Sequence, residues 1–312
     1  MRHSPGMSAR HPLPPGLPTP AFRVGDAHRA GVPPHRLRAS DVRTNVTGVR
    51  SIMPPNTLAE RCALFALRMP IASFFSHTTA AQLYGMPVPY RLSLDPRVHI
   101  AVPAPARAPH ARGLVGHALG VGEHELCTMV DGLRVTTPIR TWFDLAHALP
   151  LLDLVAAGDY LLHGEYPMVE ANDLVQALGT LRNRRIRRKL LRAADLLDPR
   201  AESAPESILR TLLMLAGIPV SRVNHSVTDR FGEFVARTDL IIDRYRVILE
   251  YQGDYHRTTK GQWRADMTRR ARLEAEGWRV MELNADDLTN PVELVRRIRT
   301  LAQLPQLPLS LS

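Results

Sequence analysis

The feature that most constrains this chain is a segment near its C-terminus, which reads FVARTDLIIDRYRVILEYQGDYH over residues 234–256. Two apolar runs rich in β-branched residues, 235–242 and 247–251, flank a short polar turn at 243–246. Runs of this composition separated by a short turn are typical of a β-hairpin. The segment therefore predicts two antiparallel strands around which a C-terminal domain is built.

The register of this hairpin brings two carboxylates together. A turn centred between Arg244 and Tyr245 sets Asp239 directly opposite Glu250, and opposed residues share a face with Cβ atoms roughly 5 Å apart. Like charges at that distance destabilise an ordinary sheet, whereas a divalent cation bound by carboxylate oxygens would remove the repulsion. Gln252 follows two residues later, on the same face as Glu250.

Ordinary ion pairs are an alternative role for both acids. In that interpretation Asp239 pairs with Arg237 or Arg246, and Glu250 pairs with a nearby arginine. We favour metal binding, because two opposed acids on a buried strand pair are costly without a cation or a shared proton.

At this point the residues resemble a known family. An Asp, a turn and then Glu-x-Gln on the next strand resembles the PD-(D/E)XK nuclease superfamily. The longer string EYQGDYH, followed by DMTRRARLEAEGWRVMELNADDL, is similar to the very-short-patch-repair-like (Vsr-like) branch of that superfamily. Over residues 204–304 the resemblance implies a restriction-endonuclease-like domain with an αβββαβ order. It also implies an endonuclease that hydrolyses phosphodiester bonds of DNA with Mg²⁺ or Mn²⁺.

The resemblance also implies roles for particular residues. Gln252 stands where the wider superfamily has Lys, and a glutamine can neither supply positive charge nor act as a base. His256 is therefore expected to take the proton, with Lys260 as a second candidate, and Gln252 to orient the nucleophile. Glu206 has a rival role, since an acid in the first turn complements the helix dipole. The implied catalytic residues are Glu206, Asp239, Glu250, Gln252 and His256, and the implied metal ligands are Asp239, Glu250 and the carbonyl of Tyr251.

The charge of the chain favours a polyanionic partner. The net charge is +10 and the pI is about 10.4, which is typical of nucleic-acid-binding proteins, although a GC-rich genome also produces Arg-rich chains. Residues 181–192 read LRNRRIRRKLLR and predict a basic amphipathic helix, which either binds phosphates or is a solvated linker. We expect double-stranded DNA as the partner, bound by Arg185, Arg188, Lys189, Lys260, Arg264, Arg269 and Arg270.

The N-terminal part carries weaker patterns. Residues 21–52 predict a helix ending at Gly31, a second helix after Pro33 and a small β-wing over 42–52. This order fits a helix-turn-helix that reads a DNA groove, or a purely structural helical cap. Further on, SHTTAAQLYG predicts a helix capped by Ser76 and ending at Gly85.

Residues 135–146 predict another helix, with Thr137 as its N-cap and Pro138 at its first position. Residues 22–164 resemble the AbiEi-type antitoxin domain, and the strings SHTTAAQLYG and DGLRVTTPIRTWFDLA carry this resemblance. That resemblance implies a winged-helix regulator, with a homodimer and a toxin partner as further expectations. The alternative function for the whole chain is then a non-catalytic DNA-binding, antitoxin-like regulator with a degenerate nuclease domain. Ser76 and His77 are adjacent, so we expect a cap and a packing or binding residue rather than a catalytic pair.

These patterns predict an α+β or α/β chain of several parts. The two cysteines, Cys62 and Cys127, form neither a disulfide framework nor a CxxC zinc motif. No apolar run is long enough to span a membrane, and the N-terminus lacks the apolar core of a signal peptide, so we expect a cytoplasmic protein. The expected parts are a disordered tail (1–20), a winged-helix and mixed α/β region (21–164), a basic helical linker (165–203), the nuclease-like domain (204–304) and a C-terminal tail (305–312).

Overall fold

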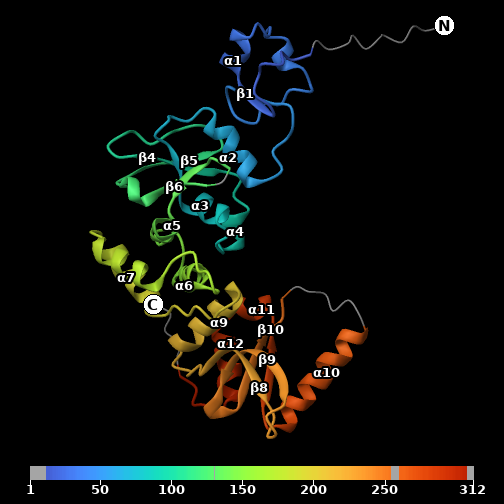
Figure 1. Ribbon diagram of the computed structural model, residues 1–312. Helices are drawn as coiled ribbons and strands as arrows, with labels where there is room; N and C mark the ends of the chain where they lie inside the picture. The colour runs from blue at the N-terminus through green and yellow to red at the C-terminus, as the bar shows by residue number, and fades with distance from the viewer. Residues whose placement is uncertain (1–11, 130, 254–259, 308–312) are drawn as a thin grey trace, which may run out of the picture. The chain divides into compact units, whose positions relative to one another are not determined.

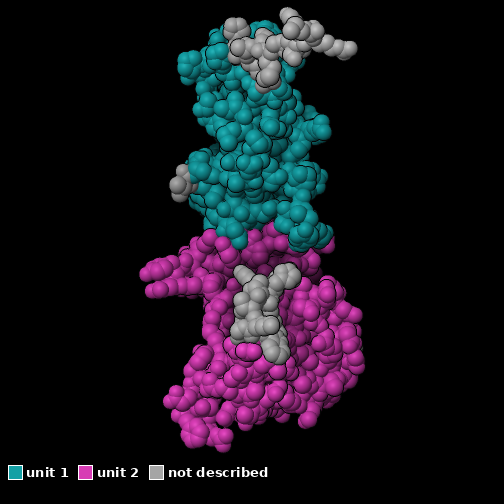
Figure 2. Space-filling view, turned by 90° about the vertical axis from the view of Figure 1, so that its right-hand side faces the viewer, with its two compact units in different colours: residues 1–85, 90–141 teal, residues 86–89, 142–312 magenta. Residues whose placement is uncertain are grey.

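The protein has a mixed α/β fold that divides into two compact units. The computed structural model describes residues 12–129, 131–253 and 260–307, with the side chains of residues 260–263 excepted. Unit 1 contains residues 1–85 and 90–141, and unit 2 contains residues 86–89 and 142–312 (Figure 2). Within the described residues, no helix is long and apolar enough to cross a membrane. The mixed fold class expected from the sequence is confirmed.

Unit 1 is built on a small two-stranded sheet and a mixed sheet with the strand order β5-β4-β3-β7-β6 (Figure 1). Strands β4 and β5 are parallel, as are β3 and β7, and the other pairs are antiparallel. The described elements are β1 (Ala21–Arg23), α1 (Val24–Arg29), β2 (Val49–Ser51), α2 (Leu58–Ala66), β3 (Phe74–Phe75), α3 (His77–Leu83), α4 (Tyr90–Ser93), β4 (Val98–Pro103), β5 (Leu114–Leu119), β6 (Leu126–Thr128) and β7 (Arg134–Thr136), with short 3₁₀ turns η1 (Arg36–Arg38) and η2 (Glu123–Glu125).

The expected helix-turn-helix is only partly present. Helix α1 ends at Arg29, and Gly31, the predicted end of the helix, follows two residues later with φ +79°. The segment after Pro33, however, forms the single 3₁₀ turn η1 instead of a second α-helix. One reason is that the guanidinium of Arg36 binds both carboxylate oxygens of Asp41, at 2.9 Å each, and folds the chain back after one turn. The expected β-wing is reduced to the pairing of β1 with β2 and a bridge between Arg43 and Ser51.

The prediction of a disordered tail over residues 1–20 is wrong for its described part. Leu17 is only 7% exposed and packs with Phe22, Ala27 and Val32 in a small core. A proline-rich segment can be ordered when one large apolar side chain docks against a core, because that burial offsets part of the ordering entropy. Residues 1–11 lie outside the described residues.

Unit 2 contains a four-stranded sheet with the order β11-β10-β9-β8, flanked by helices (Figure 1). Strands β10 and β11 are parallel and the other pairs are antiparallel. Helix α5 (Pro138–Leu145) begins in unit 1 and continues into unit 2. The other elements of unit 2 are α6 (Leu151–Leu162), α7 (Ala171–Thr180), α8 (Arg184–Ala194), α9 (Ala204–Leu215), β8 (Arg222–Thr228), β9 (Phe234–Ile242), the 3₁₀ turn η3 (Asp243–Tyr245), β10 (Val247–Tyr251), α10 (Lys260–Ala275), β11 (Arg279–Leu283), α11 (Ala285–Thr289) and α12 (Pro291–Leu301).

The run from α9 to β11 has the αβββαβ order that the sequence predicts. Alternate residues of β9 and β10 enter two different cores, as expected for strands whose side chains point to opposite faces in turn. Leu240 and Leu249 pack with leucines of α9 and α12 on one face. Ile241 and Ile248 pack with Leu273 of α10 on the other face.

The boundary between the two parts differs from the one expected. The sequence predicted an N-terminal region that ends at residue 164, followed by a linker over residues 165–203. In the structure unit 2 begins within α5, at Trp142, and contains α6, α7 and α8. The carboxylate of Asp159 in α6 accepts a hydrogen bond from the guanidinium of Arg210 in α9 at 2.8 Å, with both side chains buried. The indole N–H of Trp142 donates to the carbonyl of Leu154 at 2.8 Å. These contacts join residues far apart in the sequence, so local sequence patterns do not predict them. They include α6 in the same compact unit as α9.

Candidate acidic metal site

The hairpin register has the predicted alignment. Ile242 pairs with Val247, Ile241 with Ile248, and Leu240 with Leu249. The turn η3 closes the hairpin, and Arg246 completes it with φ +52°. Extending this register by one pair brings the next two residues, Asp239 and Glu250, opposite each other.

Both acids face helix α10. Asp239 lies two residues before Ile241, and Glu250 lies two residues after Ile248, so each shares the face of that isoleucine. Since Ile241 and Ile248 both belong to the core beneath α10, the two carboxylates lie on one side of the sheet. This is the arrangement that the metal-binding interpretation requires.

Asp239 ends the ladder between the two strands. Its Oδ2 accepts a hydrogen bond from the backbone N–H of Tyr251 at 2.7 Å, which uses a donor that could otherwise extend the backbone pairing. The side chain is half-buried. Burial raises the pKa of Asp239, and the nearby carboxylates of Glu206 and Glu202 raise it further, while the Tyr251 N–H and Arg269 oppose the rise.

Glu250 is buried and paired. It is 5% exposed, and its two oxygens accept hydrogen bonds from the Arg269 guanidinium at 3.1 and 2.8 Å. Burial raises the pKa of Glu250 in spite of Arg269, and Asp239 and Glu282 add to the rise. Arg269, which the sequence predicts to bind nucleic acid, is thus paired with Glu250 in this structure. Arg269 lies one helical turn before the buried Leu273, on the face that α10 presents to the sheet.

Among the described residues, an ion pair of the kind considered as the alternative to metal binding forms for Glu250 and not for Asp239. Arg237, which was considered as a partner of Asp239, pairs with Glu202 instead. Arg246, the other candidate, lies 4.0 Å from the ring centre of Trp278. A third acid adds to the site, because Glu282 of β11 is in register beside Glu250. Sequence reasoning missed Glu282, since the parallel pairing of β10 with β11 joins strands separated by a whole helix.

Glu206 is already bound by several groups of the protein. Its oxygens accept hydrogen bonds from the Ser203 hydroxyl at 2.8 Å, the Asn224 amide at 2.7 Å and the backbone N–H of Glu202 at 3.1 Å. Ser203 in turn accepts from the N–H of Glu206 and caps α9. These bonds give Glu206 a structural role, in which it ties the start of α9 to β8 and adds negative charge near Asp239.

The remaining predicted residues of this region are placed as follows. The backbone N–H of Gln252 donates to the Leu283 carbonyl at 2.6 Å, and its side chain is half-exposed. Arg264 is exposed, and Arg270 pairs with Glu274 at 2.9 Å. His256 lies outside the described residues. Lys260 begins α10, but its side chain also lies outside what the structure describes.

The predicted basic helix is present as α8, beside a groove. Asn183 caps it through its side chain, which accepts from the N–H groups of Arg185 and Ile186. The groove has a volume of about 850 Å³, and Arg185, Arg188, Lys189 and Arg192 contribute cationic side chains to its lining.

Lys189 has a different role from the one predicted. Its Nζ donates to the carbonyls of Ala146 and Leu149, at 2.8 and 2.5 Å, so it binds carbonyl groups just after the end of α5, and we expect it to contribute little to phosphate binding. Burial lowers the pKa of Lys189, as does the nearby Arg185. Arg185 and Arg188, which the sequence predicts to bind nucleic acid, are exposed and line the groove.

A second cluster lies in unit 1, and sequence reasoning missed it. Among the described residues, the imidazoles of His77, His99 and His117 bring three metal-ligand atoms within 4.8 Å of one another, and the carboxylates do not form such a group of three. Burial lowers the pKa of His99 to about 4 and also lowers that of His117. The expectation that Ser76 and His77 cannot face each other is wrong. The Ser76 Oγ lies 3.0 Å from the His77 Nδ1, because His77 has φ +51° and so departs from helical geometry.

Comparison with known proteins finds two distant relatives, both of them uncharacterized. No family model matches the chain, and no solved structure matches it significantly. Two proteins of Mycobacterium tuberculosis are similar to it, the uncharacterized proteins MT2308 of strain CDC 1551 / Oshkosh and Rv2248 of strain ATCC 25618 / H37Rv. Each is 27% identical over 224 residues, which cover 70% of this chain and 78% of the relative.

Proposed function

We propose that unit 2 is a metal-dependent endonuclease domain of the PD-(D/E)XK, Vsr-like type, acting on double-stranded DNA in the cytoplasm. The observation that supports it is the pair Asp239 and Glu250, which share one face of a hairpin beside the basic helix α10. Burial raises the pKa of both acids, and nearby carboxylates add to the rise, Glu206 and Glu202 for Asp239 and Asp239 and Glu282 for Glu250, so a single arginine does not compensate their charge fully. A strand pair with two such acids favours a bound cation.

The donor set fits a hard divalent cation. Carboxylate oxygens are the protein ligands that Mg²⁺ takes, usually one or two of them with several waters. Asp239 and Glu250 would hold such an ion, with the Tyr251 carbonyl as a further oxygen. When bound, Mg²⁺ or Mn²⁺ acidifies water and stabilises charge on a phosphate. Arg269 competes with a metal ion for Glu250, since its Nη1 and Nη2 both donate hydrogen bonds to that carboxylate.

The remaining roles follow from the chemistry of the side chains. Gln252 follows Glu250 by two residues and would orient the attacking water by hydrogen bonding. Proton transfer is proposed for His256, which lies outside the described residues. Arg264 is exposed on α10 and would contact phosphate.

The direct test is nicking of supercoiled plasmid by the purified full-length protein. We expect conversion to the open circular form with Mg²⁺ or Mn²⁺ and none after addition of EDTA. Protein that binds the plasmid but leaves it intact with every divalent ion tested would contradict the proposal.

One observation favours a second function, a non-catalytic DNA-binding regulator with a degenerate nuclease domain. Both oxygens of Glu250 are held by Arg269, which a permanent structural ion pair would explain without any metal. In this proposal the AbiEi-like N-terminal region regulates transcription, as a homodimer and with a toxin as partner. DNA binding that persists in EDTA without cleavage would support it.

Both functions require contact with DNA, and the groove beside α8 supplies a specific prediction. Replacing Arg185 and Arg188 together by Gln should weaken DNA binding and reduce the slope of log K against log salt by about 2, because each lost phosphate contact removes about one unit. The measurement is fluorescence anisotropy of a labelled duplex over a range of salt concentrations.

The matched control replaces Arg184 and Arg187, which lie on the same helix and are exposed but do not line the groove. Equal effects of the two double variants on the slope would show that the groove has no particular part in DNA binding.

A further inference from the structure

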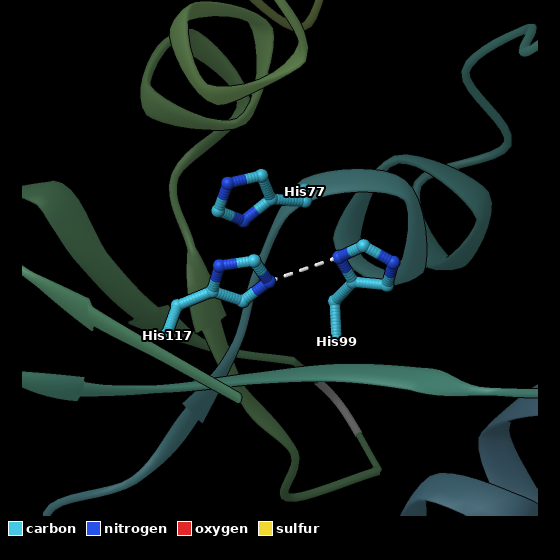
Figure 3. Close-up of side chains that lie close together, drawn as sticks. All are labelled: His77, His99 and His117. Atoms are coloured by element: carbon cyan, nitrogen blue, oxygen red, sulfur yellow. Dashed lines mark hydrogen bonds between the residues drawn. The ribbon is translucent and has the colours of Figure 1, made fainter. Parts of the chain in front are cut away.

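Three histidines from separate elements meet on the mixed sheet of unit 1 (Figure 3). His77 is the first residue of α3, His99 lies on β4 and His117 lies on β5. The Nδ1 of His99 is 3.1 Å from the Nε2 of His117. The rings of His77 and His117 are stacked, with centroids 3.9 Å apart and planes inclined by 15°. All three side chains are half-buried.

The backbone fixes this convergence. Strands β4 and β5 are parallel, with Ala101 beside His117, and His99 lies two residues before Ala101. The two imidazoles therefore share one face of the sheet. Gly116 lets β5 pass close to a neighbouring loop, because a Cβ there would lie 1.7 Å from the carbonyl oxygen of Pro109.

Helix α3 is attached to the same point on β4. The N–H of Ser76 donates to the His99 carbonyl at 3.2 Å, and the N–H of His99 donates to the Thr79 hydroxyl at 2.7 Å. His77 then has φ +51°, in the left-handed region that is uncommon for residues other than glycine. Such strained positions cluster at sites of function, and here the conformation directs the imidazole onto His117.

We propose that His77, His99 and His117 form a binding site for a late first-row transition-metal ion, with Zn²⁺ as the expected occupant. Two nitrogens bound to a tetrahedral zinc at about 2.0–2.1 Å lie about 3.3 Å from each other. The 3.1 Å between the nitrogens of His99 and His117 is close to that length. One nitrogen of His77 lies within 4.8 Å of a ring nitrogen of each of the other two histidines, so a rotation of its ring would complete a tridentate site.

A hydrogen bond between histidines is the competing explanation, and it accounts for less of the geometry. It uses one nitrogen from each of His99 and His117 and gives no reason for the third ring. A metal ion takes one lone pair from each of the three imidazoles. Three neutral imidazoles select Zn²⁺, Cu²⁺ or Ni²⁺ over Mg²⁺, which prefers oxygen. Three protein ligands leave one tetrahedral position for water or another ligand.

The contact between Ser76 and His77 belongs to the same site. The Ser76 hydroxyl lies 3.0 Å from the Nδ1 of His77 and makes no cap hydrogen bond to α3. A hydrogen bond to one ring nitrogen fixes the orientation of the ring and leaves the other nitrogen for the metal. Ser76 is thus a positioning residue for His77.

The test is a zinc titration of the full-length, chelator-treated protein in excess Mg²⁺, which occupies oxygen sites. We expect one tightly bound equivalent of Zn²⁺. His99→Gln and His117→Gln should each weaken binding by more than 100-fold, and Ser76→Ala by about 10–100-fold, as is typical of an outer-shell partner. His110→Gln is the control, because His110 is exposed in the same unit and outside the cluster. Absence of a tight equivalent, or unchanged binding by His99→Gln and His117→Gln, would overturn the proposal.

Two further measurements keep the proposal testable if those variants fold poorly. His77→Asn retains a residue that tolerates positive φ and removes one imidazole, so it should lose tight binding while keeping the far-ultraviolet circular dichroism of the wild type. X-ray absorption at the zinc edge of the wild-type protein should show a nitrogen and oxygen shell with the outer-shell scattering of about three imidazoles. A zinc coordination shell without imidazole scattering would contradict the proposed site.

Discussion

Replacing Asp239 by Asn should lower the rate of Mg²⁺-dependent plasmid nicking at least about 1000-fold, or about 4 kcal/mol of transition-state stabilisation. The substitution keeps the shape of the side chain, and the amide oxygen can still accept the Tyr251 N–H that Oδ2 now binds at 2.7 Å. The loss would therefore reflect the missing charge. Initial rates of nicking over a series of Mg²⁺ concentrations measure it.

Glu250→Gln should cause a similar loss, but it also leaves the guanidinium of Arg269 without its carboxylate. Its melting temperature must therefore be measured beside its activity. Glu233→Gln is the matched control, because Glu233 is exposed near the turn between β8 and β9 and loses the same charge. Nicking by Asp239→Asn at the wild-type rate would exclude the acidic pair as the catalytic site and favour the regulator.

The second large effect concerns the stability of unit 2. Asp159→Ala should lower the free energy of unfolding by about 3–5 kcal/mol, because it removes the carboxylate to which the buried Arg210 is hydrogen-bonded. The side chains of Arg210 and Asp159 are 3% and 1% exposed, with 2.8 Å between them. Asp159 also accepts the N–H of Asp198 at 2.7 Å, so the substitution removes a second contact between α6 and the segment before α9.

Removing both charges tests this explanation. The double variant Asp159→Leu with Arg210→Met should recover much of the lost stability, since apolar residues of similar volume replace buried ion pairs at little cost. Glu293→Gln, which breaks an exposed pair with Arg296, should change stability little. Urea unfolding followed by circular dichroism gives the comparison. A small effect of Asp159→Ala would show that α6 is not held to α9 by this pair.

Local sequence patterns were sufficient to predict most of the secondary structure of the C-terminal part. The order from α9 to β11 and the hairpin register both depend on residues close in sequence. Strand alternation, turn residues and caps are local properties, because the backbone and its nearest side chains determine them. The same reasoning placed Asp239 opposite Glu250.

Local sequence patterns were insufficient to predict the structure of the N-terminal region. The segment after Pro33 has a composition compatible with a helix, yet it forms a single 3₁₀ turn in which Arg36 pairs with Asp41. The burial of Leu17 likewise depends on a core formed by residues that follow it in sequence. Tertiary contacts override propensity here because each local preference is worth only a fraction of a kilocalorie per residue.

The sequence by itself determined the helices and strands of the C-terminal sheet and the shared face of its two acids, since a period of two residues and a short turn leave little freedom. Only the tertiary structure decided which side chains from distant parts of the sequence lie beside one another. Arg269 pairs with Glu250, Lys189 donates to backbone carbonyls, and His77, His99 and His117 come together from three elements. The physical reason is that partners distant in sequence are selected by packing of whole elements, which no window of the sequence contains.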